Sequence, residues 1–211
     1  MNVAQWQHAI GTEQAEAALA QPILVWDCET LEEMIDDEHR HEDRDAYMTH
    51  AGIAVAVVLN RNAGTYHFFT STDEEGSGHS LVDLVNMLSM ARLVISFNGK
   101  RFDNKVLGHA TGRAAFKPKL ECDVSEALFK TVGYGWGKGA WNLDAVCQRT
   151  LGGRGKTADG VFAPTHWKRG NLGHVISYCW NDVKLLDELE KFIRRYGYVV
   201  GPDARARSVR L

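Results

Sequence analysis

Two carboxylates lie two residues apart, directly after a short apolar run. Asp27 and Glu29 follow residues 23–26, whose Ile and Val side chains favour a buried strand. Because strand side chains alternate, both acids point to the same face, about 7 Å apart along the chain. Two ionised carboxylates this close repel each other unless a cation lies between them. The pair, at the carboxyl end of its strand, therefore predicts half of a metal site that needs further oxygen ligands.

A third acid follows another expected strand. Asp103 comes shortly after the apolar residues 93–97 and falls in the first turn of the next expected helix. The helix dipole favours a carboxylate there, and sites in open α/β sheets gather beyond the carboxyl ends of the strands. We therefore expect Asp103 to reach sideways toward the metal site. Asp123, at the end of the expected strand 120–124, is a weaker candidate.

A fourth acid lies on the last expected helix. Tyr178 and Asp182 are four residues apart, so the hydroxyl and the carboxylate share one helix face. Apolar side chains dock this helix on the sheet: Ile176, Val183, Leu185, Leu186 and Leu189. Taken singly, each of these groups has a structural explanation, as a solvated strand end, a first-turn acid or a half-buried face. Their order, each at the end of an appropriate element, favours a shared site.

The elements that must position these side chains follow from the apolar pattern. Residues 60–64 form an expected hairpin turn, and Ser80 and Asn142 are expected helix caps. Residues 31–49 and 152–170 read as loops, and 198–211 as a disordered basic tail. The pattern predicts strands over 23–28, 53–59, 65–70, 93–97 and 120–124, with helices over 81–88, 103–110, 124–130, 142–151 and 171–196. This order predicts an α/β protein with a mixed five-stranded sheet flanked by helices on both faces.

The composition excludes several classes of protein. Of 211 residues, 45% are hydrophobic and 24% are charged, which is typical of a globular domain with no membrane partner. The net charge of −3 argues against a generally basic nucleic-acid binder. The first residues lack the pattern of a secretory signal, and the four cysteines are scattered. We therefore expect free thiols and a reducing, cytoplasmic location, with a lead-in over 1–22 and one domain over 23–197.

The acids resemble the motif set of a known enzyme family. Asp27-Cys28-Glu29 is followed by Asn98 to Asp103, with the pattern Asn-x-x-x-Phe-Asp, and then by Tyr178 to Asp182, with the pattern Tyr-x-x-x-Asp. This order resembles the DEDD 3′–5′ exonucleases, and the tyrosine places the resemblance in the DEDDy branch. That branch includes the proofreading domains of family A and family B DNA polymerases. The resemblance spans residues 23–196 and implies a ribonuclease H-like fold, standing here without a polymerase module.

The resemblance implies a two-metal hydrolysis of phosphodiester bonds from the 3′ end. Asp27, Glu29 and Asp182 would hold the Mg²⁺ or Mn²⁺ ion that activates water, and Asp27 and Asp103 would lie near the second. Carboxylates are suitable ligands because hard divalent ions prefer oxygen. Tyr178 would orient the attacking water, since an ordinary tyrosine is a poor base at pH 7. The expected substrate is single-stranded nucleic acid, DNA favoured, released as nucleoside 5′-monophosphates.

Substrate contacts are expected outside the acid cluster. Asn98 is expected to hydrogen-bond the strand, and Phe102 either stacks on the terminal nucleotide or belongs to the core. Basic and aromatic side chains of the loops suit single-stranded nucleic acid, although they also fit a flexible surface. The candidates are Lys130, Tyr134, Trp136, Lys138, Lys156, Lys168 and Arg169, of which Lys138 and Lys168 are the main ones.

Other interpretations remain open at the level of sequence. The same fold would serve a non-catalytic nucleic-acid-binding module or a structure-specific endonuclease. His39, His41 and His50 suggest a zinc site, but no matching Cys or His pair accompanies them. The acidic loop 36–45 leaves the width of the substrate cleft open. No motif separates DNA from RNA or identifies a replication or repair protein as a further partner.

Overall fold

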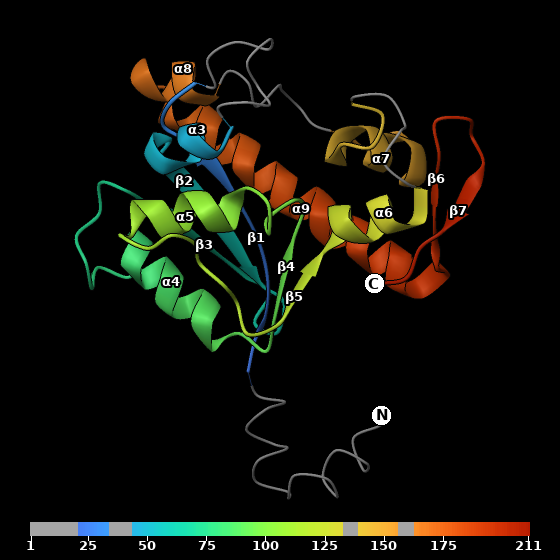
Figure 1. Cartoon of the computed structure of the whole chain (residues 1–211), viewed down its shortest axis with the longest axis horizontal. Helices are drawn as coiled ribbons and strands as arrows, with labels where there is room; N and C mark the ends of the chain where they lie inside the picture. Colours follow the sequence, from blue (N-terminus) through green and yellow to red (C-terminus); the bar gives the residue numbers. More distant parts are fainter. Residues whose placement is uncertain (1–20, 34–43, 133–138, 156–162) are drawn as a thin grey trace, which may run out of the picture.

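The computed structural model describes residues 21–33, 44–132, 139–155 and 163–211 (Figure 1). Its centre is a five-stranded sheet with the strand order β3-β2-β1-β4-β5. β1 pairs antiparallel with β2 and parallel with β4, so the expected mixed sheet is confirmed. The strands are β1 (Ile23–Thr30), β2 (Ile53–Asn60), β3 (Thr65–Thr70), β4 (Leu93–Ser96) and β5 (Glu121–Asp123).

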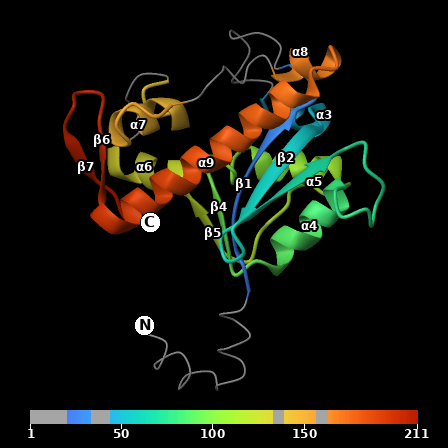
Figure 2. The same ribbon diagram turned by 180° about the vertical axis from the view of Figure 1, so that it is seen from behind.

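Helices cover both faces of the sheet, as expected. The longest helix, α9, runs diagonally across one face (Figure 2). The described helices of that face are α6 (Val124–Val132), α7 (Leu143–Thr150), α8 (Ala163–Lys168) and α9 (Leu172–Tyr196). The opposite face carries α3 (Arg44–His50), α4 (Leu81–Met90) and α5 (Asp103–Ala110).

The alternation of β1 divides its side chains between two cores. Leu24, Trp26 and Cys28 join the core under α3, α4 and α5, whereas Val25 joins the core under α9. Asp27 and Glu29 alternate with Cys28 and therefore share the α9 face with Val25. The sheet thus separates the acid pair of β1 from the cysteine that lies between them.

β1 is longer than its parallel neighbour, and this difference exposes its carboxyl end. Only residues 23–25 of β1 pair with β4, whereas the pairing with β2 continues through Glu29 and, after a register shift, to Thr30. We expected the strand to end at Cys28, which was wrong by two residues. Asp27 and Glu29 therefore lie within a paired strand, opposite Val57 and Val55, on the part that extends beyond β4.

Three segments expected to be irregular contain regular structure. α3 occupies the end of the expected loop 31–49 and continues to His50, and α8 lies within the Gly-rich loop 152–170. The tail expected to be disordered forms a hairpin of β6 (Tyr198–Val200) and β7 (Ala206–Ser208). Val199 and Val209 are buried in the α9 core, which explains the order of this segment. Residues 1–20 of the expected lead-in lie outside the described residues.

A buried ionic cluster fixes α9 to the turn between β2 and β3. The Arg61 guanidinium lies 2.5 Å from Asp187 Oδ1 and 2.6 Å from Glu190 Oε2, and Glu190 is fully buried. Lys191 and Arg194 also bind this acid pair, Lys191 at Asp187 and Arg194 at Glu190. Removing one partner of a buried ionic cluster leaves an uncompensated charge. The cluster therefore holds the orientation of the helix that carries Tyr178 and Asp182.

We expect Arg61→Ala to lower the free energy of unfolding by about 3 kcal/mol, because Glu190 would remain buried with less compensation. Urea denaturation followed by circular dichroism measures this loss. Arg154→Ala is the matched control, because its ion pair with Glu188 is exposed and is worth under about 1 kcal/mol. Equal losses in the two variants would contradict the role of the buried cluster.

Candidate active site

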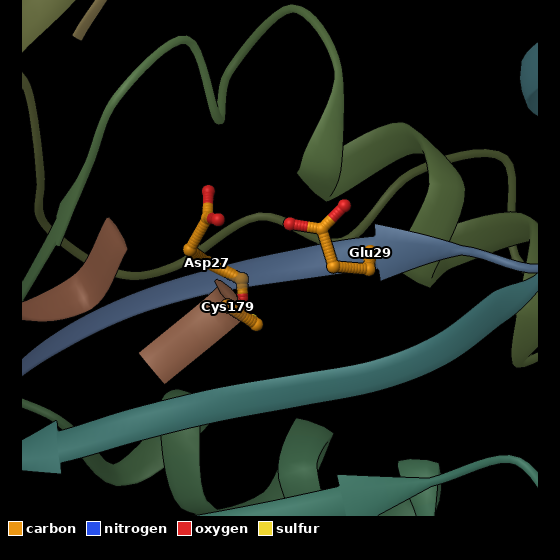
Figure 3. Close-up of side chains that lie close together, drawn as sticks. All are labelled: Asp27, Glu29 and Cys179. Atoms are coloured by element: carbon orange, nitrogen blue, oxygen red, sulfur yellow. The ribbon is translucent and has the colours of Figure 1, made fainter. Parts of the chain in front are cut away.

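The acid pair of β1 meets a thiol of α9. The ligand atoms of Asp27, Glu29 and Cys179 all lie within 4.8 Å of one another. Figure 3 shows both carboxylates on the same side of the β1 ribbon, with Cys179 arriving from α9. Among the described residues, this is the one group of three or more His, Cys, Asp or Glu side chains close enough to hold a metal ion.

Cys179 belongs to the site as a neutral thiol. Its Sγ donates a hydrogen bond to the carbonyl oxygen of Asp27 at 3.3 Å. Burial raises the pKa of the thiol well above its ordinary value, and the carboxylates of Asp27, Glu29 and Asp182 raise it further. The same interactions put Asp182 within electrostatic reach of Cys179. Two of the four expected acids, Asp27 and Glu29, therefore lie within 4.8 Å of this sulfur, and Asp182 lies about one helical turn further along α9.

Tyr178 and Asp182 lie on the inner face of α9. Their side chains are 7% and 3% exposed, respectively, and the helix packs on β1 and β2. Helical spacing of four residues puts the two side chains one above the other. The expected shared face is therefore present, and it is directed at the sheet rather than at solvent.

Asp103 reaches β1 through the other face. Cys28 Sγ donates a hydrogen bond to Asp103 Oδ1 at 3.2 Å, and both side chains are buried. Burial raises the pKa of Asp103 to about 6, although the Cys28 hydrogen bond acts in the opposite direction. Asp103 is therefore attached to the residue between Asp27 and Glu29, at the part of β1 that extends beyond β4.

The turn before Asp103 explains how this acid is placed. Asn98 has a φ of +70°, a left-handed conformation that asparagine tolerates better than most residues. A Cβ at Gly99 would lie 2.6 Å from the Ser96 side chain, so only glycine fits this close approach. Asp123 accepts hydrogen bonds from the backbone N–H groups of Asn98 at 2.9 Å and Lys100 at 3.2 Å.

Asp123 also caps the next helix, α6. Its Oδ1 accepts hydrogen bonds from the N–H groups of Ser125 at 3.0 Å and Glu126 at 3.3 Å. One buried carboxylate thus satisfies four backbone donors from two segments. The weaker site candidate therefore has a structural role: it holds the turn that leads into Asp103.

The expected substrate contacts have different placements. Phe102 is half-buried and its ring stacks on Tyr47, with centroids 6.3 Å apart. Lys168 Nζ forms an exposed ion pair with Glu32 at 2.8 Å. Asn98 is half-buried in its turn, and Lys138 lies outside the described residues, as do Tyr134, Trp136 and Lys156.

The alternative zinc interpretation gains no support from the described residues. His39 and His41 lie outside them, and the exposed His50 bonds through Nδ1 to the carbonyl oxygen of Ala46 at 2.9 Å. Sequence reasoning missed the part played by Cys28 and Cys179, which it treated only as free thiols. Their positions inside two acid motifs, Asp27-Cys28-Glu29 and Tyr178 to Asp182, were the signal available.

We expect Asp123→Ala to lower the free energy of unfolding by about 3 kcal/mol, since it removes a helix cap and leaves further backbone donors without their acceptor. Thermal and urea unfolding measure the effect. Asn142→Ala is a suitable control, because Asn142 caps α7 through one hydrogen bond, to Ala145 N at 2.8 Å, and should cost about 1 kcal/mol. A loss at Asp123 no larger than this would contradict its double role.

Comparisons with known proteins agree with this fold. No protein-family model and no curated protein matches the chain. Among solved structures, it is similar to the family B DNA polymerase from the hyperthermophilic archaeon Pyrobaculum calidifontis, with a TM-score of 0.59 and 12% sequence identity. The match covers 82% of this chain and 24% of that one, so the chain spans about a quarter of the polymerase. The likeness to this polymerase shows an α/β fold with a mixed five-stranded sheet, consistent with the ribonuclease H-like fold.

No helix in the described ranges has the length and hydropathy needed to cross a membrane.

Proposed function

We propose that this protein is a metal-dependent 3′–5′ exonuclease of the DEDDy type, acting on single-stranded nucleic acid. The observation that carries the proposal is the convergence of Asp27 and Glu29 on one face of β1, with their ligand atoms within 4.8 Å. Asp182 on α9 and Asp103 on α5 supply further carboxylates at the same end of the strand. The structural likeness to a DNA polymerase supports a substrate of nucleic acid, with DNA favoured over RNA.

The donor set fits hard divalent cations. Carboxylate oxygens are the ligands that Mg²⁺ and Mn²⁺ prefer, whereas zinc sites favour thiolate and imidazole. The one sulfur in the group donates a hydrogen bond to Asp27 O, and we leave it out of the proposed ligand set. We assign the metal ligands as Asp27, Glu29, Asp103 and Asp182. When bound, two such ions supply water activation and charge neutralisation at the phosphate.

The residues of the chain have distinct roles in this proposal. Asp27 would serve both cations, as the resemblance to the DEDDy enzymes implies. Tyr178 shares the inner face of α9 with Asp182 and orients the attacking water through its hydroxyl. Asn98 and Phe102 border the site next to Asp103 and are proposed substrate contacts. The leaving nucleotide carries the 5′-phosphate, which gives nucleoside 5′-monophosphates as products.

We expect Asp27→Asn and Asp182→Asn each to lower the rate of metal-dependent degradation more than about a hundredfold, since each removes a metal ligand. The assay follows a 5′-labelled single-stranded DNA oligonucleotide with Mg²⁺ or Mn²⁺, beside its RNA counterpart and an EDTA control. Glu188→Gln is the matched control, because this acid of α9 pairs with Arg154 at the surface. Circular dichroism checks that each variant folds.

The pattern of products separates the alternatives. A ladder that shortens from the 3′ end establishes an exonuclease, whereas opening of a circular DNA would indicate an endonuclease. If the protein binds DNA or RNA but cleaves neither, the result would indicate a non-catalytic module. Full activity in purified Asp27→Asn would contradict the assigned site.

We also expect Mn²⁺ to stabilise the protein, because a cation relieves the repulsion among the acids. At one hundred times its dissociation constant, a ligand adds about 2.7 kcal/mol, which corresponds to roughly 5–10 °C in a domain of this size. Differential scanning fluorimetry measures the shift. Asp27→Asn should lose most of it, and an equal shift in the wild-type protein and this variant would place the ion elsewhere.

A further inference from the structure

A cation rests on an aromatic pair beside the acid cluster. The Arg44 guanidinium carbon lies 5.7 Å from the centroid of the Phe102 ring. The Phe102 ring stacks on Tyr47 with an interplanar angle of 16°. Phe102 directly precedes Asp103, one of the proposed metal ligands. The three side chains therefore form a border of the site that joins α3 to the start of α5.

This border is attached firmly to the end of β1. The Tyr47 hydroxyl lies 2.9 Å from Thr30 Oγ1 and 2.7 Å from the carbonyl oxygen of Glu32. Lys105 Nζ on α5 lies 2.7 Å from Asp45 Oδ1 on α3. Thr30 follows Glu29 directly, so these contacts attach α3, which begins at Arg44, to the strand end that carries the acid pair.

Arg44 differs from the other cations around the site in its partners. Lys100 pairs with Glu126, Lys105 with Asp45, and Lys168 with Glu32. No carboxylate of residues 21–33, 44–132, 139–155 or 163–211 lies within ion-pair distance of Arg44. Asp45, which directly follows Arg44 in the sequence, is bound by Lys105. Among the described residues, the Arg44 guanidinium therefore has an aromatic contact and no ion pair.

We propose that Arg44 binds a backbone phosphate of the substrate strand beside the metal site, with Phe102 and Tyr47 as its support. The planar guanidinium matches phosphate oxygens through two parallel hydrogen bonds, which a lysine does not reproduce. An aromatic face under the guanidinium restricts its orientation without neutralising its charge. The proposal rests on the proposed function for its substrate class and adds a phosphate contact from a helix that no acid motif includes.

The test measures binding separately from hydrolysis. A 5′-fluorescein single-stranded DNA is titrated with full-length protein carrying Asp27→Asn, in Mg²⁺, between 50 and 200 mM salt, with fluorescence anisotropy as the readout. Adding Arg44→Ala should weaken binding about tenfold and reduce the slope of log affinity against log salt by about 0.7, as expected for one lost phosphate contact on a single strand. Arg44→Lys should keep the slope but recover only part of the affinity.

Arg113→Ala is the matched charge control, because Arg113 follows the far end of α5 and is exposed. It should change neither affinity nor slope by a comparable amount. In the otherwise wild-type protein, Arg44→Ala should raise KM for the oligonucleotide while kcat is retained, since the contact is present before and during the reaction. Phe102→Leu should produce a smaller rise in KM, because the guanidinium loses its aromatic support.

The outcomes distinguish this proposal from the proposed function. If the wild-type protein degrades DNA but Arg44→Ala changes neither KM nor the salt slope, the phosphate contact is wrong and the exonuclease stands. If no polymer is degraded but the slope depends on Arg44, the exonuclease is wrong and the phosphate contact stands. Weaker binding with an unchanged slope, or no binding of single-stranded DNA by the Asp27→Asn protein at 50 mM salt, would also overturn the phosphate contact.

Discussion

The site depends on the part of β1 that extends beyond β4. There the strand is paired on one side only, by β2, and its Asp27 and Glu29 side chains share one face. Side-by-side carboxylates repel each other, so this segment needs rigid support. The support comes from the ladder to β2, which is buried almost throughout, and from α9, which packs on both strands. The strand order therefore leaves the carboxyl end of β1 without a partner on the β4 side and supports it on the β2 side.

Two thiols connect the acids that approach from opposite faces of the sheet. Cys179 bonds to the carbonyl oxygen of Asp27 from α9, and Cys28 bonds to the Asp103 carboxylate toward α5. A buried thiol is a small, weak donor, so it fills space beside a carboxylate without adding charge. Asp103 and Asp182 are almost fully buried, which is unfavourable for ionised groups. A divalent cation would offset that penalty, which links the proposed chemistry to the stability of the fold.

Much of this arrangement could be predicted from the sequence, because the signals are local. The apolar periodicity indicates the five strands and the main helices, and Ser80 and Asn142 cap helices as expected. The proximity of Asp27 and Glu29 could be predicted because strand alternation puts them on one face. The extension of β1 to Thr30 was missed, since polar residues in a strand depend on a partner strand that periodicity does not reveal.

Other features depend on contacts between distant segments. Asp123 acts on the turn at Asn98, 25 residues earlier, and no spacing rule connects the two. The C-terminal hairpin is ordered because two valines enter a core formed by other elements, which an arginine-rich composition conceals. α3 is short and charged, and it is fixed by Tyr47, Phe102 and Lys105 rather than by helix propensity. Tertiary contacts therefore decide both the position of Asp103 and the border that carries Arg44.

The central claim is that the end of β1 holds divalent cations between carboxylates from three elements. Anomalous diffraction from a crystal grown with Mn²⁺ tests it most directly. The account predicts manganese peaks about 2.1 Å from the carboxylate oxygens of Asp27 and Glu29, with Asp103 or Asp182 completing the coordination. Manganese bound only elsewhere, or no peak at this strand end at saturating Mn²⁺, would contradict it.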